Sequence, residues 1–325
     1  MKNSSRQSSS TLNYVLLGAL IVALALLPFV LPSYPLHLAV LILLYVYLGQ
    51  SYNISAGFAG CFGFLHPIFI GTGAYTSTLL FTKMGLTPWL GMLAGAVLAV
   101  ILSLPITYVA IRAKLPRLSF ALITMAFVFI AVYAADSFAV LGGGDRGVQI
   151  PFRPGLANFQ FSSKIGFYYI MLAMTITLMV VCWQMLRSRM GLYFRAMADN
   201  EKASEAVGVN LVKYNLIAMG ISAFFTALGG SFYAQFVGSL LPSTAISLEL
   251  MIGVILFLAV GGFGTFWGPV VGVGLLMPIG EILRSRLPQF QTLHLLLYGL
   301  IVIVILSVLP HGIMGYITSK LDRNH

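Results

Sequence analysis

The stretch LLLYGLIVIVILSVL at residues 295–309 is apolar on every side, and so is IVALALLPFVL at residues 21–31. A strand of an outer-membrane barrel would alternate apolar and polar residues over about ten positions, and neither stretch does so. Residues 7–82, a run of 76 positions, contain no Asp, Glu, Lys or Arg, although about 20 apolar residues suffice for one transmembrane helix. The sequence therefore predicts an all-α integral membrane protein that crosses the bilayer several times.

The composition excludes a water-soluble globule. The 325 residues include 18 Lys and Arg and 8 Asp and Glu, where a soluble chain of this length would carry roughly 80 charged residues. Hydrophobic residues make up 59% of the chain. Cys61 and Cys182 lie in apolar runs, so they indicate free buried cysteines rather than a disulfide framework.

Charge-free runs separated by Gly and Pro predict about ten transmembrane helices, some of them short or broken. The expected spans are 13–31, 36–54, 64–81, 88–110, 118–138, 165–186, 214–237, 248–263, 268–283 and 293–310. Gly and Pro interrupt the spans at 64–81, 248–263 and 268–283, which are therefore candidates for broken or re-entrant segments buried in protein. The pairs Gly91/Gly95 and Gly268/Gly272 have a spacing that allows two helices to approach closely.

Basic residues cluster between the apolar segments, so the net charge of +10 indicates the positive-inside bias and not nucleic-acid binding. Residues 1–12, 111–117 and 187–213 fall on one side if ten helices alternate. We expect that side to be the cytoplasm, with both termini on it. Arg284 and Arg286 would then lie outside, which leaves the helix count open by one near the C-terminus.

One membrane domain at 13–316 accounts for nearly the whole chain. We expect a cytosolic tip at 1–12 and a cytosolic tail at 317–325. Within the domain, residues 139–164 form the expected external loop, and residues 187–213 form a polar cytosolic segment with five cations and three acids.

Motifs for catalysis are missing from the sequence. Neither the phosphate loop GxxxxGK[ST] nor HExxH occurs, so we expect no ATP hydrolysis, metal site or cofactor in this chain, and no enzymatic activity. Asp136, Glu249 and Glu281 lie near span ends, where a carboxylate can reach water, and His66 lies among helix-breaking residues. A carrier or channel driven by an ion gradient stays open as an alternative and would use such residues.

The polar segment at 187–213 predicts a short amphipathic helix at the cytosolic surface. Its two small apolar faces are formed by Phe194, Met197 and Ala198 and by Ala203, Ala206 and Val207. Asp199 or Asn200 can cap the second turn, and Gly208 can end it. The functional interpretation is a helix that docks into a groove on a cytosolic protein; an ordinary solvated loop is the alternative.

Within this segment, RAMADNE at 195–201, EAVGVN at 205–210 and then Lys213 and Tyr214 resemble the cytoplasmic loop of a known family. It comprises the membrane permeases of ATP-binding-cassette importers for branched-chain amino acids, with their urea and amide relatives. The resemblance implies a coupling helix that contacts the ATPases. The residues it assigns to that contact are Arg195, Asp199, Glu201, Ala203, Glu205, Ala206 and Gly208.

A second motif, GFAG at 57–60 followed by GTGAY at 71–75, is similar to the glycine-rich segment that helps to line the path in this family. The implied pathway residues are Gly57, Gly60, His66, Gly71, Gly73 and Tyr75. Plain helix packing is the alternative role for the glycines, and a packing histidine is the alternative for His66. Cys61, Gly63 and Leu65 stand where the family usually has Gln, Ser and Gly, which leaves the solute open.

Residues 142–151 and the stretch GGFGTFWGP at 261–269 add weaker similarity, and the likeness runs over roughly residues 40–316. The first of these assigns Gly142, Gly143, Asp145 and Gly147 to the external loop. The resemblance implies a permease subunit in the bacterial inner membrane that carries a branched-chain or other small hydrophobic amino acid, or alternatively urea or a short amide. It implies three kinds of protein partner besides lipid: a sister permease, two cytosolic ATPases and an external solute-binding protein.

Overall fold

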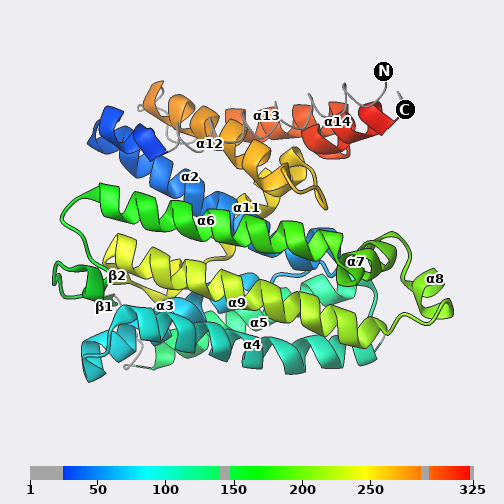
Figure 1. Cartoon of the computed structure of the whole chain (residues 1–325), viewed down its shortest axis with the longest axis horizontal. Coiled ribbons are helices and arrows are strands. Elements are labelled where there is room, and N and C mark those ends of the chain that lie inside the picture. Colours follow the sequence, from blue (N-terminus) through cyan, green and yellow to red (C-terminus); the bar gives the residue numbers. More distant parts are fainter. Residues whose placement is uncertain (1–24, 114, 139–146, 287–292, 323–325) are drawn as a thin grey trace, which may run out of the picture.

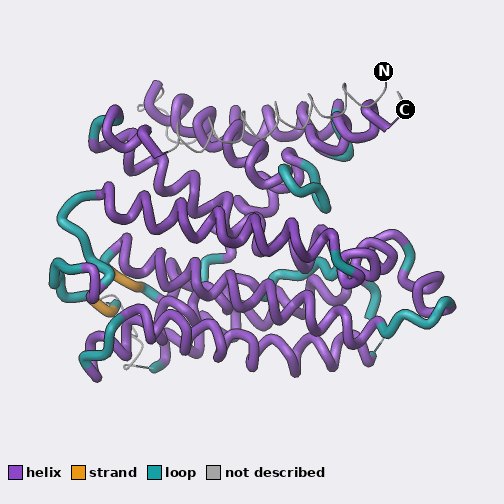
Figure 2. Tube along the Cα trace, in the orientation of Figure 1, coloured by secondary structure: helices purple, strands orange, loops and turns teal. Residues whose placement is uncertain are grey.

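The computed structural model describes residues 25–113, 115–138, 147–286 and 293–322. Long helices run side by side along the longest axis of the molecule, with a few short loops between them (Figures 1 and 2). In chain order the elements are α2 (Ser33–Tyr52), the π-helical turn η1 (Asn53–Phe58), α3 (His66–Met84), α4 (Pro88–Arg112), α5 (Arg117–Ser137), β1 (Val148–Gln149), the 3₁₀ turn η3 (Leu156–Asn158), α6 (Lys164–Arg187), α7 (Arg189–Asp199), α8 (Glu201–Ala206), α9 (Leu211–Val237), β2 (Ser239–Leu240), α10 (Pro242–Ala245), α11 (Leu248–Gly261), α12 (Gly268–Arg286), α13 (Leu293–Val308) and α14 (Gly312–Asp322).

Seven segments of the described chain are long and apolar enough to cross a membrane. They are Ser33–Phe58, Pro88–Arg112, Arg117–Ser137, Lys164–Arg187, Leu211–Val237, Pro242–Gly261 and Leu296–Thr318. The all-α membrane class is therefore confirmed, whereas the count of ten is not. The expected spans at 64–81 and 268–283 correspond to α3 and α12, which are outside these seven, and the span at 13–31 begins outside the described residues.

Glycines allow α3, α4 and α9 to pack with their backbones almost in contact. A Cβ atom on Gly73 of α3 would lie 1.9 Å from the carbonyl oxygen of Ala227 in α9. A Cβ on Gly91 of α4 would lie 2.6 Å from Cα of Ser77, and one on Gly95 would lie 2.9 Å from Cα of Gly73. The close approach expected at Gly91 and Gly95 is thus confirmed, and small residues are what membrane helices use for such contacts.

The two ends of the molecule differ in structure (Figure 1). At one end β1 and β2 form a short antiparallel pair, in which Val148 faces Leu240. Gly147 precedes β1 with φ +60°, and a Cβ there would lie 2.5 Å from the Leu240 carbonyl oxygen, so only glycine fits. The other external-loop candidates, Gly142, Gly143 and Asp145, lie outside the described residues.

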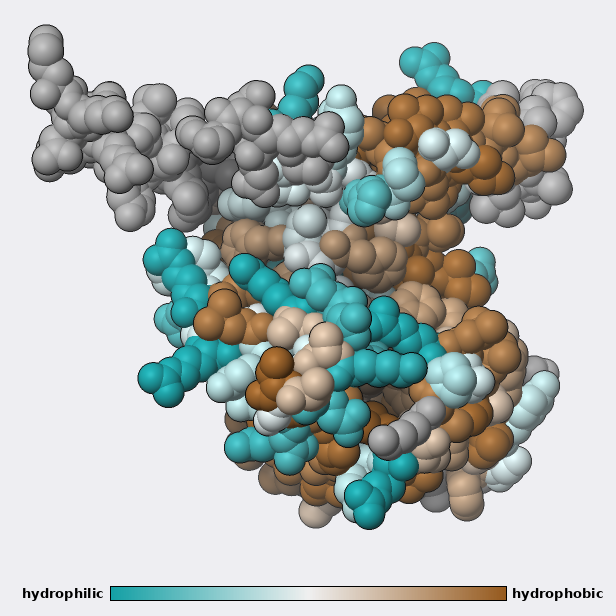
Figure 3. Space-filling view, turned by 90° about the vertical axis from the view of Figure 1, so that its right-hand side faces the viewer, coloured by the Kyte–Doolittle hydropathy of each residue, from teal (hydrophilic) through white to brown (hydrophobic). Residues whose placement is uncertain are grey.

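Helices α7 and α8 occupy the opposite end, toward which α14 also points (Figure 1). Hydrophilic side chains gather on this end when it faces the viewer (Figure 3). Residues 317–322, expected as part of a simple tail, continue the helix α14.

Candidate functional site

The chain leaves the helical conformation in the middle of its glycine-rich segment. Helix α2 runs into the π-helical turn η1, residues 59–65 are not helical, and α3 begins at His66. Gly60 has φ +75°, a conformation that residues with a Cβ rarely adopt. Pro67 then sits in the first turn of α3, where its missing N–H costs nothing. We refer to residues 53–65 as the α2–α3 break.

A second interruption lies directly against the first. Helix α11 ends at Gly261 and α12 begins at Gly268, with a six-residue loop between them. The buried side chain of Asn53 donates from Nδ2 to the Thr265 carbonyl oxygen over 2.9 Å and accepts from the Gly264 N–H over 3.0 Å. Asn53 thus provides hydrogen-bond partners for the Thr265 carbonyl and the Gly264 N–H. Non-helical backbone inside a membrane requires such partners, because lipid tails cannot form hydrogen bonds.

A buried group of polar side chains joins the α2–α3 break to α9. The Ser222 hydroxyl donates to the Ser51 carbonyl oxygen over 2.6 Å and lies 2.7 Å from His66 Nε2 and 3.2 Å from Ser55 Oγ. Because its single hydrogen goes to Ser51, the 2.7 Å contact requires His66 to donate from Nε2. The Ser51 hydroxyl lies 3.0 Å from Thr226 Oγ1. These contacts hold three helices together in the protein interior.

His66 itself is 1% exposed and packs edge-on against the Tyr52 ring, with 4.6 Å between ring centroids. Its Nδ1 atom is buried and has no hydrogen-bond partner among the described residues. This environment favours the packing histidine over a residue that faces an open path.

The expected pathway residues separate into two groups. Gly57 and Gly60 belong to the α2–α3 break, and a Cβ on Gly57 would lie 2.6 Å from the Gly264 nitrogen. Gly73 faces α9, and Gly71 faces the segment between α10 and α11, since a Cβ on Gly71 would lie 2.4 Å from Cγ1 of Ile246. Tyr75, also on α3, is 6% exposed. The structure brings only the first group and His66 to the break.

The polar segment forms two helices rather than one. Asn200 takes an extended conformation between α7 and α8, and its Oδ1 accepts the Ala203 N–H over 3.0 Å, so it caps α8 as expected. Gly208 follows α8 with φ +90°. The apolar face of α7 is buried, with Phe194 and Met197 fully covered. The apolar residues of α8 and its end are exposed: Ala203, Ala206 and Val207.

Arg117, the first residue of α5, connects this segment to the α2–α3 break. Its Nε donates to Glu201 Oε1 over 3.1 Å, and its Nη2 donates to the Ala198 carbonyl oxygen over 3.1 Å. A Cβ on Gly60 would lie 2.9 Å from Cα of Ala198 and 3.4 Å from Arg117 Nη2. The sequence indicated Arg117 only as one of the cytosolic cations, because its partners lie about 80 residues away along the chain.

Two further residues of α5 contact the α2–α3 break. The Thr124 hydroxyl oxygen accepts a hydrogen bond from the Phe64 N–H over 2.9 Å. The Phe120 ring packs against Gly63, since a Cβ on Gly63 would lie 2.8 Å from a ring carbon of Phe120. One helix thus contacts both the break and the polar segment.

A cavity of about 580 Å³ lies where the break, the α4–α5 turn, α8 and the start of α9 meet. Cys61, Arg112, Arg117, Lys202 and Asn215 are among its lining residues. This cavity joins the glycine-rich segment and the polar segment in space, although they are about 140 residues apart in sequence.

The remaining ionisable candidates do not join this site. Asp136 and Glu249 are exposed, and Glu281 accepts a hydrogen bond from the Tyr34 hydroxyl. In the described part of the chain, no three His, Cys, Asp or Glu residues are arranged to hold a metal ion.

A family model described as "Branched-chain amino acid transport system / permease component" matches residues 34–306. The chain is 24% identical over 322 residues to the high-affinity branched-chain amino acid transport system permease protein LivM of Escherichia coli (strain K12), covering 92% of this chain and 74% of LivM. It is 26% identical over 298 residues to LivH of the same strain, covering 83% of this chain and 91% of LivH.

A more distant relative is the guanosine ABC transporter permease protein NupQ of Bacillus subtilis (strain 168). It is 27% identical over 238 residues, which cover 67% of this chain and 72% of NupQ. No solved structure matches the chain.

Proposed function

Because the chain belongs to the family of branched-chain amino acid transport system permease components, we propose that it forms the path for a branched-chain or other small hydrophobic amino acid in an ATP-driven importer. It is a multi-pass inner-membrane protein and a transport subunit rather than an enzyme. The names of LivM and LivH support the solute class. The similarity to NupQ supports a nucleoside as the second candidate, ahead of urea or a short amide.

The importer would contain this chain, a sister permease, two cytosolic ATPases and an external solute-binding protein. LivM and LivH are both permeases of branched-chain amino acid systems, which supports a pair of related permeases. Helix α8 is the proposed contact with an ATPase. In support, Ala203 and Ala206 are exposed at the polar end of the molecule, and Val207 is 79% exposed. Small exposed apolar residues on a capped helix suit a helix-in-groove contact.

The observation that carries the proposal is the pair of hydrogen bonds from Arg117 to α7 and α8. ATP binding would move α8, and the bonds to Glu201 and Ala198 would transmit that movement to α5. Because Thr124 of α5 accepts a hydrogen bond from the Phe64 N–H, the α2–α3 break would move together with α5. Alternating access would then arise from a change at the break, with no chemical reaction in this chain.

Photo-cross-linking in intact cells tests the ATPase contact. A benzophenone amino acid in place of Ala203 should capture a nucleotide-hydrolysing protein, because Ala203 faces outward on α8. The matched control carries the same group in place of Leu156, which is 71% exposed in the segment between β1 and α6, and should capture no ATPase. The same group in place of Ala206, which is also exposed, gives a second test. If neither the Ala203 nor the Ala206 variant captures an ATPase, the contact is overturned.

Reconstitution in liposomes tests the class and the solute. Uptake of leucine should require the sister permease, the ATPases and ATP, and excess guanosine or urea should leave it unchanged. Leucine uptake by this chain alone would instead support a carrier driven by an ion gradient, and inhibition by guanosine would support the nucleoside alternative.

A further inference from the structure

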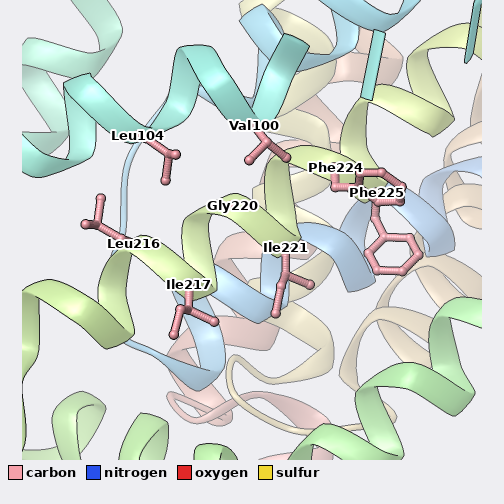
Figure 4. Close-up of a pocket in the computed structure, with 8 residues that line it drawn as sticks. All are labelled: Val100, Leu104, Leu216, Ile217, Gly220, Ile221, Phe224 and Phe225. Atoms are coloured by element: carbon pink, nitrogen blue, oxygen red, sulfur yellow. The ribbon is translucent and has the colours of Figure 1, made fainter. Parts of the chain in front are cut away.

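An open apolar groove of about 470 Å³ runs between α4 and α9 on the outer surface of the helical bundle (Figure 4). Val100 and Leu104 of α4 form one wall, and Leu216, Ile221 and Phe224 of α9 are among the residues on the other. The volume lies within the range of about 300 to 1,000 Å³ that small-molecule sites occupy. An all-apolar lining at membrane depth fits a hydrocarbon chain.

Gly220 makes room for such a chain at the middle of the groove (Figure 4). The nearest atom to a Cβ built on Gly220 is Cγ1 of Val100, at 3.7 Å. This is ordinary van der Waals distance, so the groove exists because Gly220 lacks a side chain and not because two backbones must touch there. A larger side chain at this position would extend into the groove.

The groove is one leaflet deep. Its α9 residues extend from Leu216 to Phe225, which corresponds to roughly 14 Å along a helix. Half of the hydrocarbon core of a bilayer is about 15 Å. A partner helix packed along α9 would follow the whole of Leu211–Val237, roughly 40 Å, whereas this groove ends at Phe224 and Phe225 near its middle.

Positive charge marks the end of the groove that faces α7 and α8. Lys213 precedes Ile217 by four residues and Gly220 by seven, so it lies on the same face of α9, and it is exposed. Arg112, the last residue of α4, is exposed at the same end. Basic residues at the membrane surface attract anionic lipid headgroups, by about 1 kcal/mol each.

We infer that this groove binds one acyl chain of an anionic glycerophospholipid, with the lipid phosphate held at Lys213 and Arg112. The lipid belongs to the leaflet on the side of α7 and α8. The depth of the groove, its apolar lining and the charge at one end together select a lipid over a second protein. The inference concerns lipid binding only and does not depend on the solute or the ATPase contact.

Native mass spectrometry of the purified full-length chain tests the site, with dioleoyl phosphatidylglycerol or dioleoyl phosphatidylcholine added in detergent. The wild-type chain should retain one phosphatidylglycerol. Gly220→Leu fills the groove and should lower that retention at least tenfold, whereas Gly220→Ala should retain the lipid. Gly299→Leu is the matched control, because a Cβ at Gly299 meets nothing within 4 Å, and it should behave as wild type.

The headgroup is tested separately. Lys213→Gln should lower the preference for phosphatidylglycerol over phosphatidylcholine roughly fivefold, the value of one lost cation at the surface. If Gly220→Leu does not reach the membrane, Leu104→Trp fills the groove from α4 and should give the same loss. Unchanged phosphatidylglycerol retention by a groove-filling variant would overturn the inference, as would a photo-cross-linker at Ile221 that captures the sister permease.

Discussion

Helices α9 and α5 are both long and apolar enough to cross a membrane, but protein covers them to different extents. In the most apolar 18-residue stretch of each, 61% of the residues of α9 are buried and only 28% of those of α5. Close backbone contacts through glycine hold α9 against α3, as at Gly73 and Gly230. Helix α5 is held to the α2–α3 break and to α7 and α8 mainly through Arg117, Phe120 and Thr124.

The difference separates a tightly packed scaffold from a helix that protein covers less, which is the helix that the proposed mechanism would move. Helix α9 packs against α3 with the two backbones in contact. Because protein interiors are close-packed and transmit strain, neither helix can shift without moving the other. Helix α5 has a smaller apolar contact, in which Val128 and Ala135 pack with Ile246. Substitutions in the scaffold should have the largest effect, substitutions in the connection through α5 an intermediate effect, and a substitution at the start of α8, the proposed ATPase contact, the smallest effect.

The largest effect is expected for Gly73→Leu. A Cβ at this position would lie 1.9 Å from a backbone oxygen of α9, so the helices must separate, at a cost of about 3 kcal/mol or more. The amount of folded protein in the membrane should fall sharply, measured by immunoblotting and by thermal unfolding in detergent. Gly274→Leu is the control, because its Cβ meets nothing within 4 Å. Normal membrane levels with lost uptake would instead make Gly73 a pathway residue.

An intermediate effect is expected for reversal of the Arg117–Glu201 pair. The two side chains are 54% and 47% exposed, so the pair adds less than about 1 kcal/mol to stability. Arg117→Glu and Glu201→Arg should leave membrane levels unchanged but lower the amount of solute taken up per ATP hydrolysed. The double charge swap should recover part of this coupling. If both single variants and the double swap couple uptake to ATP hydrolysis as well as the wild type does, α5 has no part in the proposed mechanism.

The smallest effect is expected for Asn200→Ala. This change removes the side-chain acceptor for the Ala203 N–H and should destabilise α8 by about 1 kcal/mol. Hydrogen exchange at Ala203 should become faster, and the exchange of α9 should not change. Asn200→Asp keeps a capping oxygen and should exchange at the wild-type rate. If Asn200→Ala exchanges no faster than wild type, the cap does not hold α8.

The sequence located the polar segment and the glycine-rich segment because each is a local departure from an apolar background. The interruption was expected within the span 64–81, whereas the structure places it at residues 59–65, before the continuous helix α3. The capping role of Asn200 and the turn at Gly208 follow from the preferences of those residue types, and both are confirmed. Arg117 escaped this reasoning, since an arginine before a membrane helix is typical of the positive-inside bias and gives no sign of its partner.

The membrane class and the family were determined by the sequence alone, because apolar run length, charge distribution and motif spacing are properties of the linear chain. Which glycines pack helices and which lie at a break was decided only by the tertiary structure. Gly57 and Gly73 look equivalent in the sequence, yet one adjoins an unwound segment and the other a carbonyl oxygen of α9. That distinction depends on contacts between residues more than 150 positions apart, and local preferences carry no information about them.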